Sequence, residues 1–267
     1  MSNSLAKSSD NQINTSPDFG DRVVETKGLT KKYGRETVVD RLDLVVRAGE
    51  IFGFLGPNGA GKTTTLLMLL GLSEPSGGQA RVLGLDPVKS PLEVKSQVGY
   101  LPENMGFYGD LTAAENLGYV AELCHLDNFQ ALLADTLKLV GLGEAQDRLV
   151  STFSRGMRQR LGLAEVLIKK PKLIFLDEPT LGLDPDGIAT MLDLIERLPR
   201  QLGLTIILSS HLLHLVARVA HRVAILNRGR LLAVGSVDDL AKEVGLEPDL
   251  ERIYRYYFRV DNQEGAA

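Results

Sequence analysis

Alternating and continuous stretches of apolar residues divide much of the chain into short predicted strands. Residues 42–46 read Leu-Asp-Leu-Val-Val, and this alternation of apolar and polar positions predicts a half-exposed strand. Residues 51–55 are almost continuously apolar, which is typical of a strand buried on both faces of a parallel sheet. The buried-strand pattern returns three times in the second half of the chain, at residues 173–176, 205–208 and 223–226.

The middle of the chain has a helical period instead. Two successive stretches repeat apolar residues every three or four positions, the first with Leu117, Val120, Ala121 and Cys124, the second with Phe129, Leu132, Leu133, Leu137 and Val140. The Gly141-Leu142-Gly143 run predicts the end of the second helix. We therefore predict a helical subdomain at about residues 92–168, inserted into a mainly parallel α/β core.

The last part of the chain predicts a hairpin and a final helix. Asn227-Arg228-Gly229 separates two apolar stretches and is typical of a hairpin turn. Residues 246–267 form the predicted C-terminal helix and tail, in which four apolar residues make two i,i+4 pairs, Ile253, Tyr254, Tyr257 and Phe258. This helix is expected to pack on the core, with a partner-binding role as the less favoured alternative.

Composition narrows the class of protein. The 267 residues are 44% hydrophobic and 24% charged, as in ordinary globular proteins, and the net charge of −4 argues against a broad basic surface for nucleic acid. Cys124 has no second cysteine with which to pair. No apolar run approaches the ~18 residues of a membrane-spanning helix. Residues 1–21 are polar and predict a disordered tail.

The strongest chemical signal directly follows the strand at residues 51–55. It matches GxxxxGK[ST], a loop whose backbone N–H groups surround phosphate oxygens at a helix N-terminus. The expected roles are phosphate contact for Lys62 and Mg²⁺ coordination for the Thr63 hydroxyl. We expect the nucleotide to contact Gly56, Pro57, Asn58, Gly59, Ala60, Gly61, Lys62, Thr63 and Thr64.

Two adjacent carboxylates end the apolar stretch at residues 173–176. Asp177 can hold Mg²⁺ through water, and Glu178 can polarise the water that attacks the terminal phosphate. Taken alone, the pattern fits an ordinary strand and charged turn as well as a catalytic site. Together with the phosphate-binding loop it predicts nucleotide hydrolysis.

A third segment, Phe153-Ser154-Arg155-Gly156-Met157, precedes a helical stretch. Ser154 is a good N-cap for that helix, and a hydroxyl at a helix N-terminus can also bind an anion. On its own this segment indicates helix capping more than ligand binding.

The ordered set of segments resembles the nucleotide-binding domain of the ABC ATPase family, over about residues 22–245. Phe153–Met157 stands where that family has its signature, Leu183-Asp184 resembles its D-loop, and Ser209-Ser210-His211 resembles its switch histidine. The resemblance implies a P-loop NTPase (RecA-like) α/β core with an N-terminal antiparallel β subdomain and the helical insertion. It also implies adenine stacking by Tyr33, a γ-phosphate contact by His211, and nucleotide contacts by Ser154, Gly156 and Asp184.

Two positions depart from the common family pattern. Glu103 stands where many members have glutamine, and its carboxylate is expected to coordinate Mg²⁺ or orient water. Met157 replaces the last glutamine of the signature. Both substitutions are similar to those of ATPases paired with ABC-2 type membrane proteins, mostly exporters. The chain also resembles, within that group, ATPases for maturation of a copper-containing nitrous oxide reductase.

The resemblance implies the cofactors and partners as well. ATP and Mg²⁺ are expected between two head-to-tail copies, and a multispanning ABC-2 type membrane subunit is expected near Glu103, with Phe107, Tyr108 and Leu111 as contacts or as internal packing. The chain is then a peripheral protein on the cytoplasmic face of the inner membrane, with no nucleic acid partner. The alternatives are a soluble ABC ATPase acting on ribosomes or DNA, and an ATP-dependent assembly or maturation factor.

Overall fold

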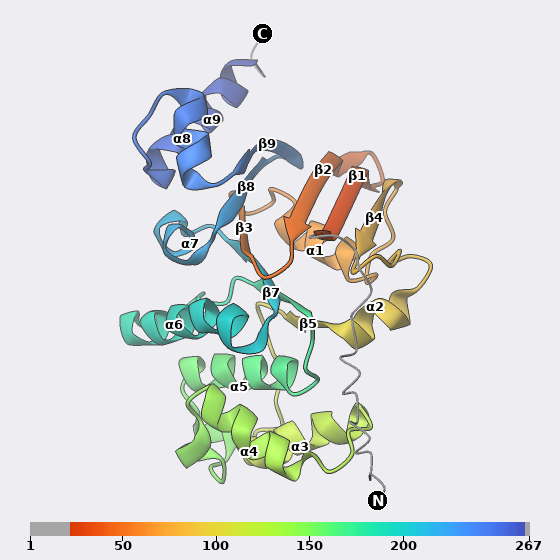
Figure 1. Ribbon diagram of the computed structural model, residues 1–267, viewed down its shortest axis with the longest axis vertical. Coiled ribbons are helices and arrows are strands. Elements are labelled where there is room, and N and C mark those ends of the chain that lie inside the picture. Colours follow the sequence, from red (N-terminus) through yellow and green to blue (C-terminus); the bar gives the residue numbers. More distant parts are fainter. Residues whose placement is uncertain (1–21, 265–267) are drawn as a thin grey trace, which may run out of the picture.

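The computed structural model describes residues 22–264, and the predicted tail at residues 1–21 lies outside this range. Within these residues the strands form a three-stranded antiparallel sheet and a six-stranded sheet, with helices at one end and around the larger sheet (Figure 1). The helices are α1 Lys62–Leu69, α2 Pro91–Gln97, α3 Ala113–Leu123, α4 Phe129–Leu139, α5 Arg155–Leu167, α6 Pro185–Leu202, α7 Leu213–Val219, α8 Val237–Val244 and α9 Leu250–Glu264. Two short 3₁₀ turns occupy Gly143–Ala145 and Val150–Thr152.

The smaller sheet has the strand order β2-β1-β4 and consists of β1 (Arg22–Tyr33), β2 (Glu36–Arg47) and β4 (Gly77–Val82). Its pairs are all antiparallel. In β2 the apolar residues Leu42, Leu44 and Val46 are buried while the residues between them are more exposed. The alternation in the sequence therefore correctly predicts this half-exposed strand.

The larger sheet has the order β5-β6-β7-β3-β8-β9. Its strands are β3 Ile51–Leu55, β5 Val98–Leu101, β6 Leu173–Asp177, β7 Thr205–Ser210, β8 Arg222–Asn227 and β9 Arg230–Gly235. All neighbours are parallel except β8 and β9, which form the predicted antiparallel hairpin. Every residue of β3, β6 and β7 is buried, as their continuous apolar runs predict.

The larger sheet is the middle layer of the molecule. Phe52, Phe54 and Phe175 belong to a hydrophobic cluster that continues into the smaller sheet and α1. Leu55, Ile174 and the apolar faces of α5 and α6 belong to a second cluster. Both faces of the sheet are thus covered, which is the arrangement expected for a parallel α/β core.

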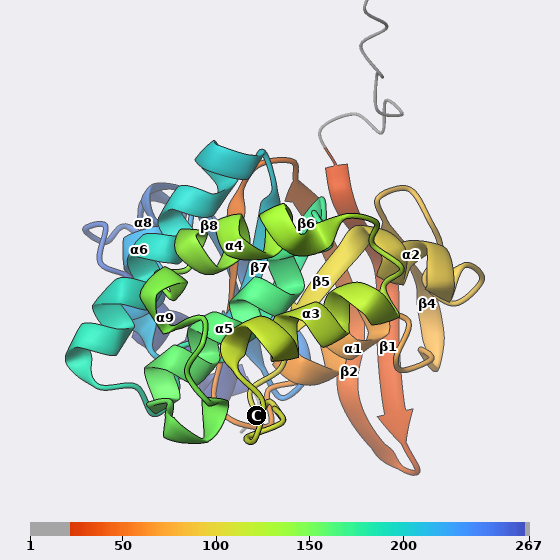
Figure 2. The same ribbon diagram turned by 90° about the horizontal axis from the view of Figure 1, so that it is seen from below.

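The helical block consists of α3, α4 and α5, which lie together at the bottom of the molecule in Figure 1 and nearest the viewer in Figure 2. Thr112 and Glu115 form a capping box at the start of α3. The predicted start of this block near residue 92 is too early, because Val98–Leu101 pairs with β6 in the larger sheet. Helix α5 packs against the larger sheet as well as against α3 and α4. Its contact with the sheet is close, because a Cβ on Gly99 of β5 would lie only 2.3 Å from Val166 of α5.

The C-terminal helix packs on the core, as the aromatic spacing predicts. Ile253 of α9 is fully buried, and Tyr254, Tyr257 and Phe258 pack against the same cluster. Asp261 accepts hydrogen bonds of 2.8 Å from Asn227 and 2.8 Å from Arg230, which join α9 to the β8–β9 hairpin. Residues 265–267 lie outside the described range.

Candidate functional site

The carboxyl ends of three parallel strands meet at one edge of the larger sheet. Leu55, the last residue of β3, pairs with Ser210 of β7, and Asp177, the last residue of β6, pairs with Ser209. The segments that follow these strands are the phosphate-binding loop, Glu178 and His211. Strand pairing therefore places the phosphate-binding loop beside two groups that lie more than a hundred residues further along the sequence.

The loop between β3 and α1 leaves the first turn of the helix open. Gly61 is the N-cap of α1 with φ 95° and supplies no side-chain cap, and the first turn contains no acidic residue. A Cβ on Gly61 would lie 2.6 Å from the Val38 carbonyl oxygen, so only glycine fits this position. The free N–H groups and the positive end of α1 form a site for an anion such as a phosphate.

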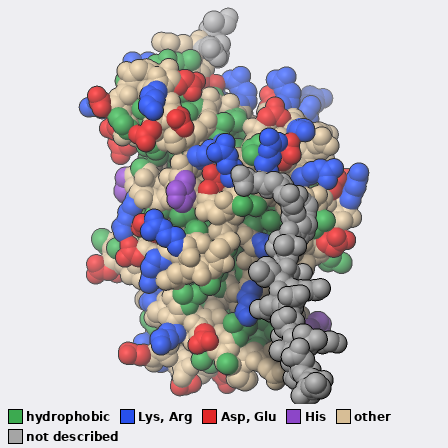
Figure 3. Space-filling view, in the orientation of Figure 1, with side chains coloured by type: hydrophobic (Ala, Val, Ile, Leu, Met, Phe, Trp, Pro, Cys, Tyr) green, Lys and Arg blue, Asp and Glu red, His purple; other side chains and the backbone are tan. Residues whose placement is uncertain are grey.

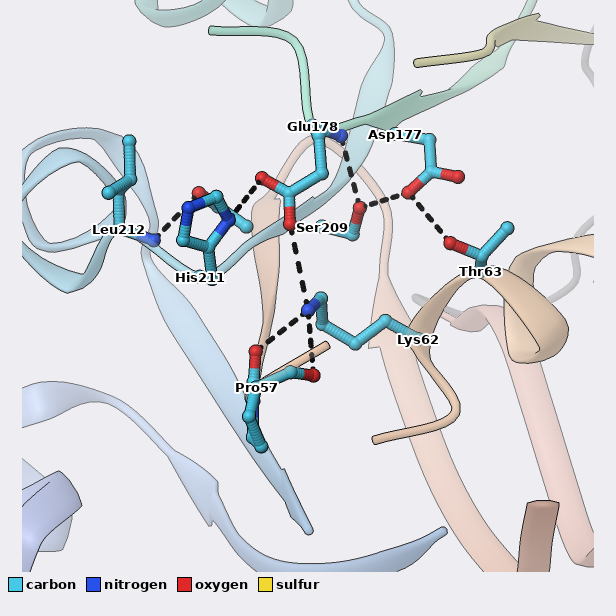
Figure 4. Close-up of polar contacts among 10 residues, drawn as sticks. Pro57, Lys62, Thr63, Asp177, Glu178, Ser209, His211 and Leu212 are labelled. Atoms are coloured by element: carbon cyan, nitrogen blue, oxygen red, sulfur yellow. Dashed lines mark hydrogen bonds and ion pairs between the residues drawn. The ribbon is translucent and has the colours of Figure 1, made fainter. Parts of the chain in front are cut away.

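Lys62 is the cation of this loop, and only 6% of it is exposed. Its Nζ donates to the carbonyl oxygens of Gly56 at 2.7 Å and Pro57 at 3.2 Å (Figure 4). The same Nζ lies 3.6 Å from Glu178 Oε1. The ammonium group thus stands between the phosphate-binding loop and the second carboxylate of the Asp177-Glu178 pair.

Asp177 accepts hydrogen bonds from hydroxyl groups of three different elements. Thr63 Oγ1 donates to Oδ1 at 3.2 Å, Ser209 Oγ donates to Oδ1 at 2.5 Å, and the Tyr100 hydroxyl lies 3.5 Å from Oδ2. Burial, together with the neighbouring charge of Asp177, raises the pKa of Tyr100 to about 12. Tyr100 is therefore a neutral hydrogen-bond donor at neutral pH.

Glu178 has a backbone conformation that is rare for a side chain of its size, with φ 48°. Its carboxylate lies between Lys62 and His211, whose Nδ1 is 3.0 Å from Oε2. This contact is a hydrogen bond in the His211 tautomer with the proton on Nδ1, from which a carboxylate oxygen accepts. The other carboxylate oxygen of Glu178, Oε1, is buried and accepts no hydrogen bond from the described residues. A buried oxygen of this kind can accept a proton from a bound water, as a general base does.

The hydroxyl of Thr63 and the carboxylate of Asp177 fit Mg²⁺. This ion prefers oxygen ligands and is commonly held by one or two protein oxygens, with water and substrate phosphates completing its shell. Among residues 22–264, no cluster of three or more His, Cys, Asp or Glu side chains has the arrangement of a metal site. The pair at the start of α1 and the end of β6 matches the kind of site in which the nucleotide supplies the other ligands.

The other predicted site residues lie on separate segments. Tyr33 ends β1 with 53% of its surface exposed, and Lys31 Nζ lies 4.9 Å from its ring centroid. Glu103 is exposed in the segment after β5, where its charge contributes to the raised pKa of Tyr100. Neither residue is among the hydrogen-bonded groups around Asp177 and Glu178.

Ser154 and Asp184 are both N-caps. The Ser154 hydroxyl accepts from Met157 N at 3.2 Å at the start of α5, and Asp184 accepts from Gly187 N at 3.0 Å at the start of α6. The two helix starts adjoin, because a Cβ on Gly156 would lie 3.9 Å from Gly187 Cα. The capping role that the sequence predicts for Ser154 is thus confirmed, and its nucleotide contact stays a prediction.

Two residues at the carboxylates are additions to the site predicted from the sequence. Ser209 and Tyr100 both contact Asp177, whereas the sequence motifs indicate a role only for the nearby His211 and Glu103. His221 Nδ1 accepts a hydrogen bond of 2.9 Å from Ile51 N, which gives this histidine a structural role. Cys124, the last residue of the first helical repeat in the sequence, is the partly exposed C-cap of α3.

Comparisons with known proteins agree with this geometry. The family model described as ABC transporter matches residues 39–181. The bacitracin transport ATP-binding protein BcrA of Bacillus licheniformis is 43% identical over 220 residues, covering 82% of this chain and 72% of BcrA. The daunorubicin/doxorubicin resistance ATP-binding protein DrrA of Streptomyces peucetius is 39% identical over 235 residues, covering 87% of this chain and 70% of DrrA.

A solved structure shares both the sequence pattern and the architecture. It is described as the ATP-binding subunit of an ABC transporter, and superposes with a TM-score of 0.79 at 31% identity, covering 88% of this chain and 99% of that one. The chain belongs to the ABC transporter family, as an ATP-binding subunit that hydrolyses ATP to power transport.

Proposed function

We propose that the chain binds ATP with Mg²⁺ and works as one half of a homodimer that drives an ABC-2 type membrane subunit in export. The homodimer is supported by the finding that the predicted nucleotide contacts form two separate sets on one copy of the chain. One set is the buried group of Lys62, Asp177 and Glu178, and the other is the exposed pair of helix starts at Ser154 and Asp184. A second copy brings its helix starts to the nucleotide on the first.

The chemistry divides between the residues of one copy. Lys62 and the N–H groups at the start of α1 bind the phosphates, while Thr63 and Asp177 hold Mg²⁺, which neutralises charge on the phosphate oxygens. Glu178 accepts the proton of the attacking water. His211 orients the Glu178 carboxylate through its Nδ1. Exposed Tyr33 stacks on adenine, and Glu103 is a further Mg²⁺ ligand in this proposal.

A groove beside the helical block supports docking of a membrane subunit. It has a volume of about 330 Å³ between the segment after β5 and helices α3 and α5, and its lining includes Pro102, Met105 and Glu165. Phe107 packs on the core, while Tyr108 is 52% exposed with its ring against Tyr119. Leu111 is only partly exposed, so Tyr108 is the most accessible of the three predicted partner contacts. No helix among residues 22–264 is long and apolar enough to cross a membrane.

Export is supported by the relatives, of which one is described as a bacitracin transport protein and another by resistance to daunorubicin and doxorubicin. Their names do not favour the ribosome, DNA or maturation alternatives. Figure 3 also shows basic and acidic side chains mixed over one face, unlike a continuous basic surface for nucleic acid. The chain then lies on the cytoplasmic face of the membrane, held by its membrane subunit.

Purification of the tagged chain from detergent-solubilised membranes of its own host tests this assembly. We expect a multispanning membrane protein to co-purify and the complex to lose ATPase activity when Mg²⁺ is chelated. Recovery with ribosomes or DNA in place of a membrane protein would support the soluble alternative. ATP-driven uptake of a solute by the reconstituted complex would contradict export.

The groove also gives a prediction about pH. Burial raises the pKa of the Glu165 carboxyl to about 7. The folded protein therefore binds this proton more tightly than the unfolded chain does, and stability falls as pH rises from about 4.3 to about 7. We expect Glu165→Gln to raise the free energy of unfolding by about 1–2 kcal/mol at pH 8 and to change it little at pH 4.

Urea unfolding at both pH values measures this difference. Glu122→Gln is the matched control, because Glu122 is exposed on the neighbouring helix α3. Equal effects of the two substitutions at pH 8 would show that burial of Glu165 is not the cause.

A further inference from the structure

Ser209 is a fully buried hydroxyl at the centre of the site. Strand β7 lies between β6 and β3, and Ser209 is 0% exposed there. A buried hydroxyl without hydrogen bonds destabilises a protein by about 1–3 kcal/mol, so the contacts of this group matter. Its Oγ donates to Asp177 Oδ1 at 2.5 Å and accepts from Glu178 N at 3.2 Å (Figure 4).

These two contacts fix the direction of the hydroxyl proton. An amide N–H only donates, so a lone pair of Ser209 Oγ faces Glu178. The hydroxyl proton is therefore free to point at Asp177, whose ionised carboxylate accepts it. A single side chain thus contacts both adjacent acidic residues, one through its carboxylate and the other through its backbone.

The hydrogen bonds from Glu178 N to Ser209 help to hold the unusual backbone conformation of Glu178. A non-glycine residue with φ 48° is strained by about 1–3 kcal/mol and persists only where its surroundings hold it. Glu178 N donates to both the carbonyl oxygen and the hydroxyl of Ser209, at 3.1 and 3.2 Å. This forked contact supports the turn that directs the Glu178 carboxylate toward Lys62 and His211.

We propose that Ser209 is a positioning residue for ATP hydrolysis, which holds the Asp177 carboxylate for Mg²⁺ and the Glu178 backbone for the general base. The proposal rests on the Mg²⁺-ATP chemistry proposed above. Ser209 acts through the two acids and does not itself touch the nucleotide. Loss of its hydroxyl leaves Asp177 Oδ1 with Thr63 as its remaining protein donor, although Thr63 is also the residue expected to bind the metal.

Three variants of the full chain test the proposal by steady-state ATPase assays. We expect Ser209→Ala to lower kcat about 10-fold or more, since small displacements of catalytic groups have large effects on rate. KM for ATP is expected to stay within about twofold, because the phosphate-binding loop is unchanged. Ser209→Thr keeps the hydroxyl and should retain most of kcat. Ser210→Ala is the control: Ser210 is equally buried, but its hydroxyl accepts from Leu212 N.

A metal-binding measurement gives a readout that does not depend on turnover. Mn²⁺ is titrated by electron paramagnetic resonance in the presence of a non-hydrolysable ATP analogue. We expect Ser209→Ala to bind Mn²⁺ several-fold more weakly than the wild type and Ser210→Ala to bind it equally well. Thermal unfolding shows whether each variant is folded. If Ser209→Ala is not, Ser209→Cys replaces it, since its thiol is a weak donor of similar shape.

Two results would overturn the proposal. One is a folded Ser209→Ala with wild-type kcat and Mn²⁺ affinity, and the other is an equal loss in Ser209→Ala and Ser210→Ala. Both require that the wild type hydrolyses ATP with Mg²⁺. Absence of Mg²⁺-dependent hydrolysis in the wild type would instead count against the proposed function itself.

Discussion

Replacing Glu178 by glutamine is expected to slow ATP hydrolysis by a factor of about 10²–10⁴ while leaving ATP binding nearly unchanged. The amide keeps the shape of the side chain but accepts a proton from water far less readily. Glu178 Oε1 is buried and accepts no hydrogen bond from the described residues, so it is the oxygen placed to receive that proton. Single-turnover hydrolysis and equilibrium binding of a fluorescent ATP analogue measure the two effects separately.

The same variant tests the dimer. Because it retains ATP, Glu178→Gln should form an ATP-dependent dimer that light scattering detects. Glu251→Gln is a suitable control, since this acid is exposed in the first turn of α9, away from the helix starts at Ser154 and Asp184. Wild-type turnover in Glu178→Gln would exclude the general-base role, and a monomer at saturating ATP, even with the membrane subunit present, would contradict the sandwiched nucleotide.

Replacing Lys62 by methionine is expected to abolish measurable ATP binding and also to destabilise the protein without nucleotide. The second effect follows from the 3.6 Å approach of Lys62 Nζ to Glu178 Oε1, both on side chains that are at least nine-tenths buried. Removal of one partner leaves a buried charge with less compensation, which typically destabilises a protein by about 3–5 kcal/mol. His211 still faces Glu178, so we expect about 2–3 kcal/mol here.

The double variant Lys62→Met with Glu178→Gln separates the two roles of the lysine. Removing the carboxylate charge should restore most of the lost stability, giving a coupling energy of about 1–3 kcal/mol in urea unfolding. ATP binding should not return, because the phosphate contact is still missing. Additive losses of stability in the double variant would show that the ion pair contributes nothing. Lys172→Met, at an exposed lysine, controls for loss of charge alone.

Local patterns of the sequence predicted the local parts of the site. The loop from Gly56 to Thr63 was identifiable because strand, glycine turn and helix follow one another directly, and Asp177-Glu178 because they end an apolar run. Ser209 required knowledge of which residues pair between β6 and β7, and a single sequence does not contain that register. Tyr100 depends in the same way on the pairing of β5 with β6.

The start of the helical block also depends on strand pairing that a single sequence does not reveal. Val98–Leu101 is a four-residue strand beside a short helix, and its apolar pattern alone fits either layer of the fold. Its place at the edge of the larger sheet depends on pairing with Leu173–Leu176. Glu178 is a further case, since nothing in a sequence marks a glutamate that will adopt a positive φ.

The length of helix α5 amplifies small rotations. Val166, near one end of the helix, packs closely on Gly99 of β5, and Ser154 lies at the other end. At 1.5 Å per residue the distance between Val166 and Ser154 along the helix is about 18 Å. A tilt of about 5° about Val166 would therefore displace Ser154 by about 1.6 Å, roughly half the length of a hydrogen bond. Small rotations of the helical block are thus enough to make or break contacts at the far end of α5.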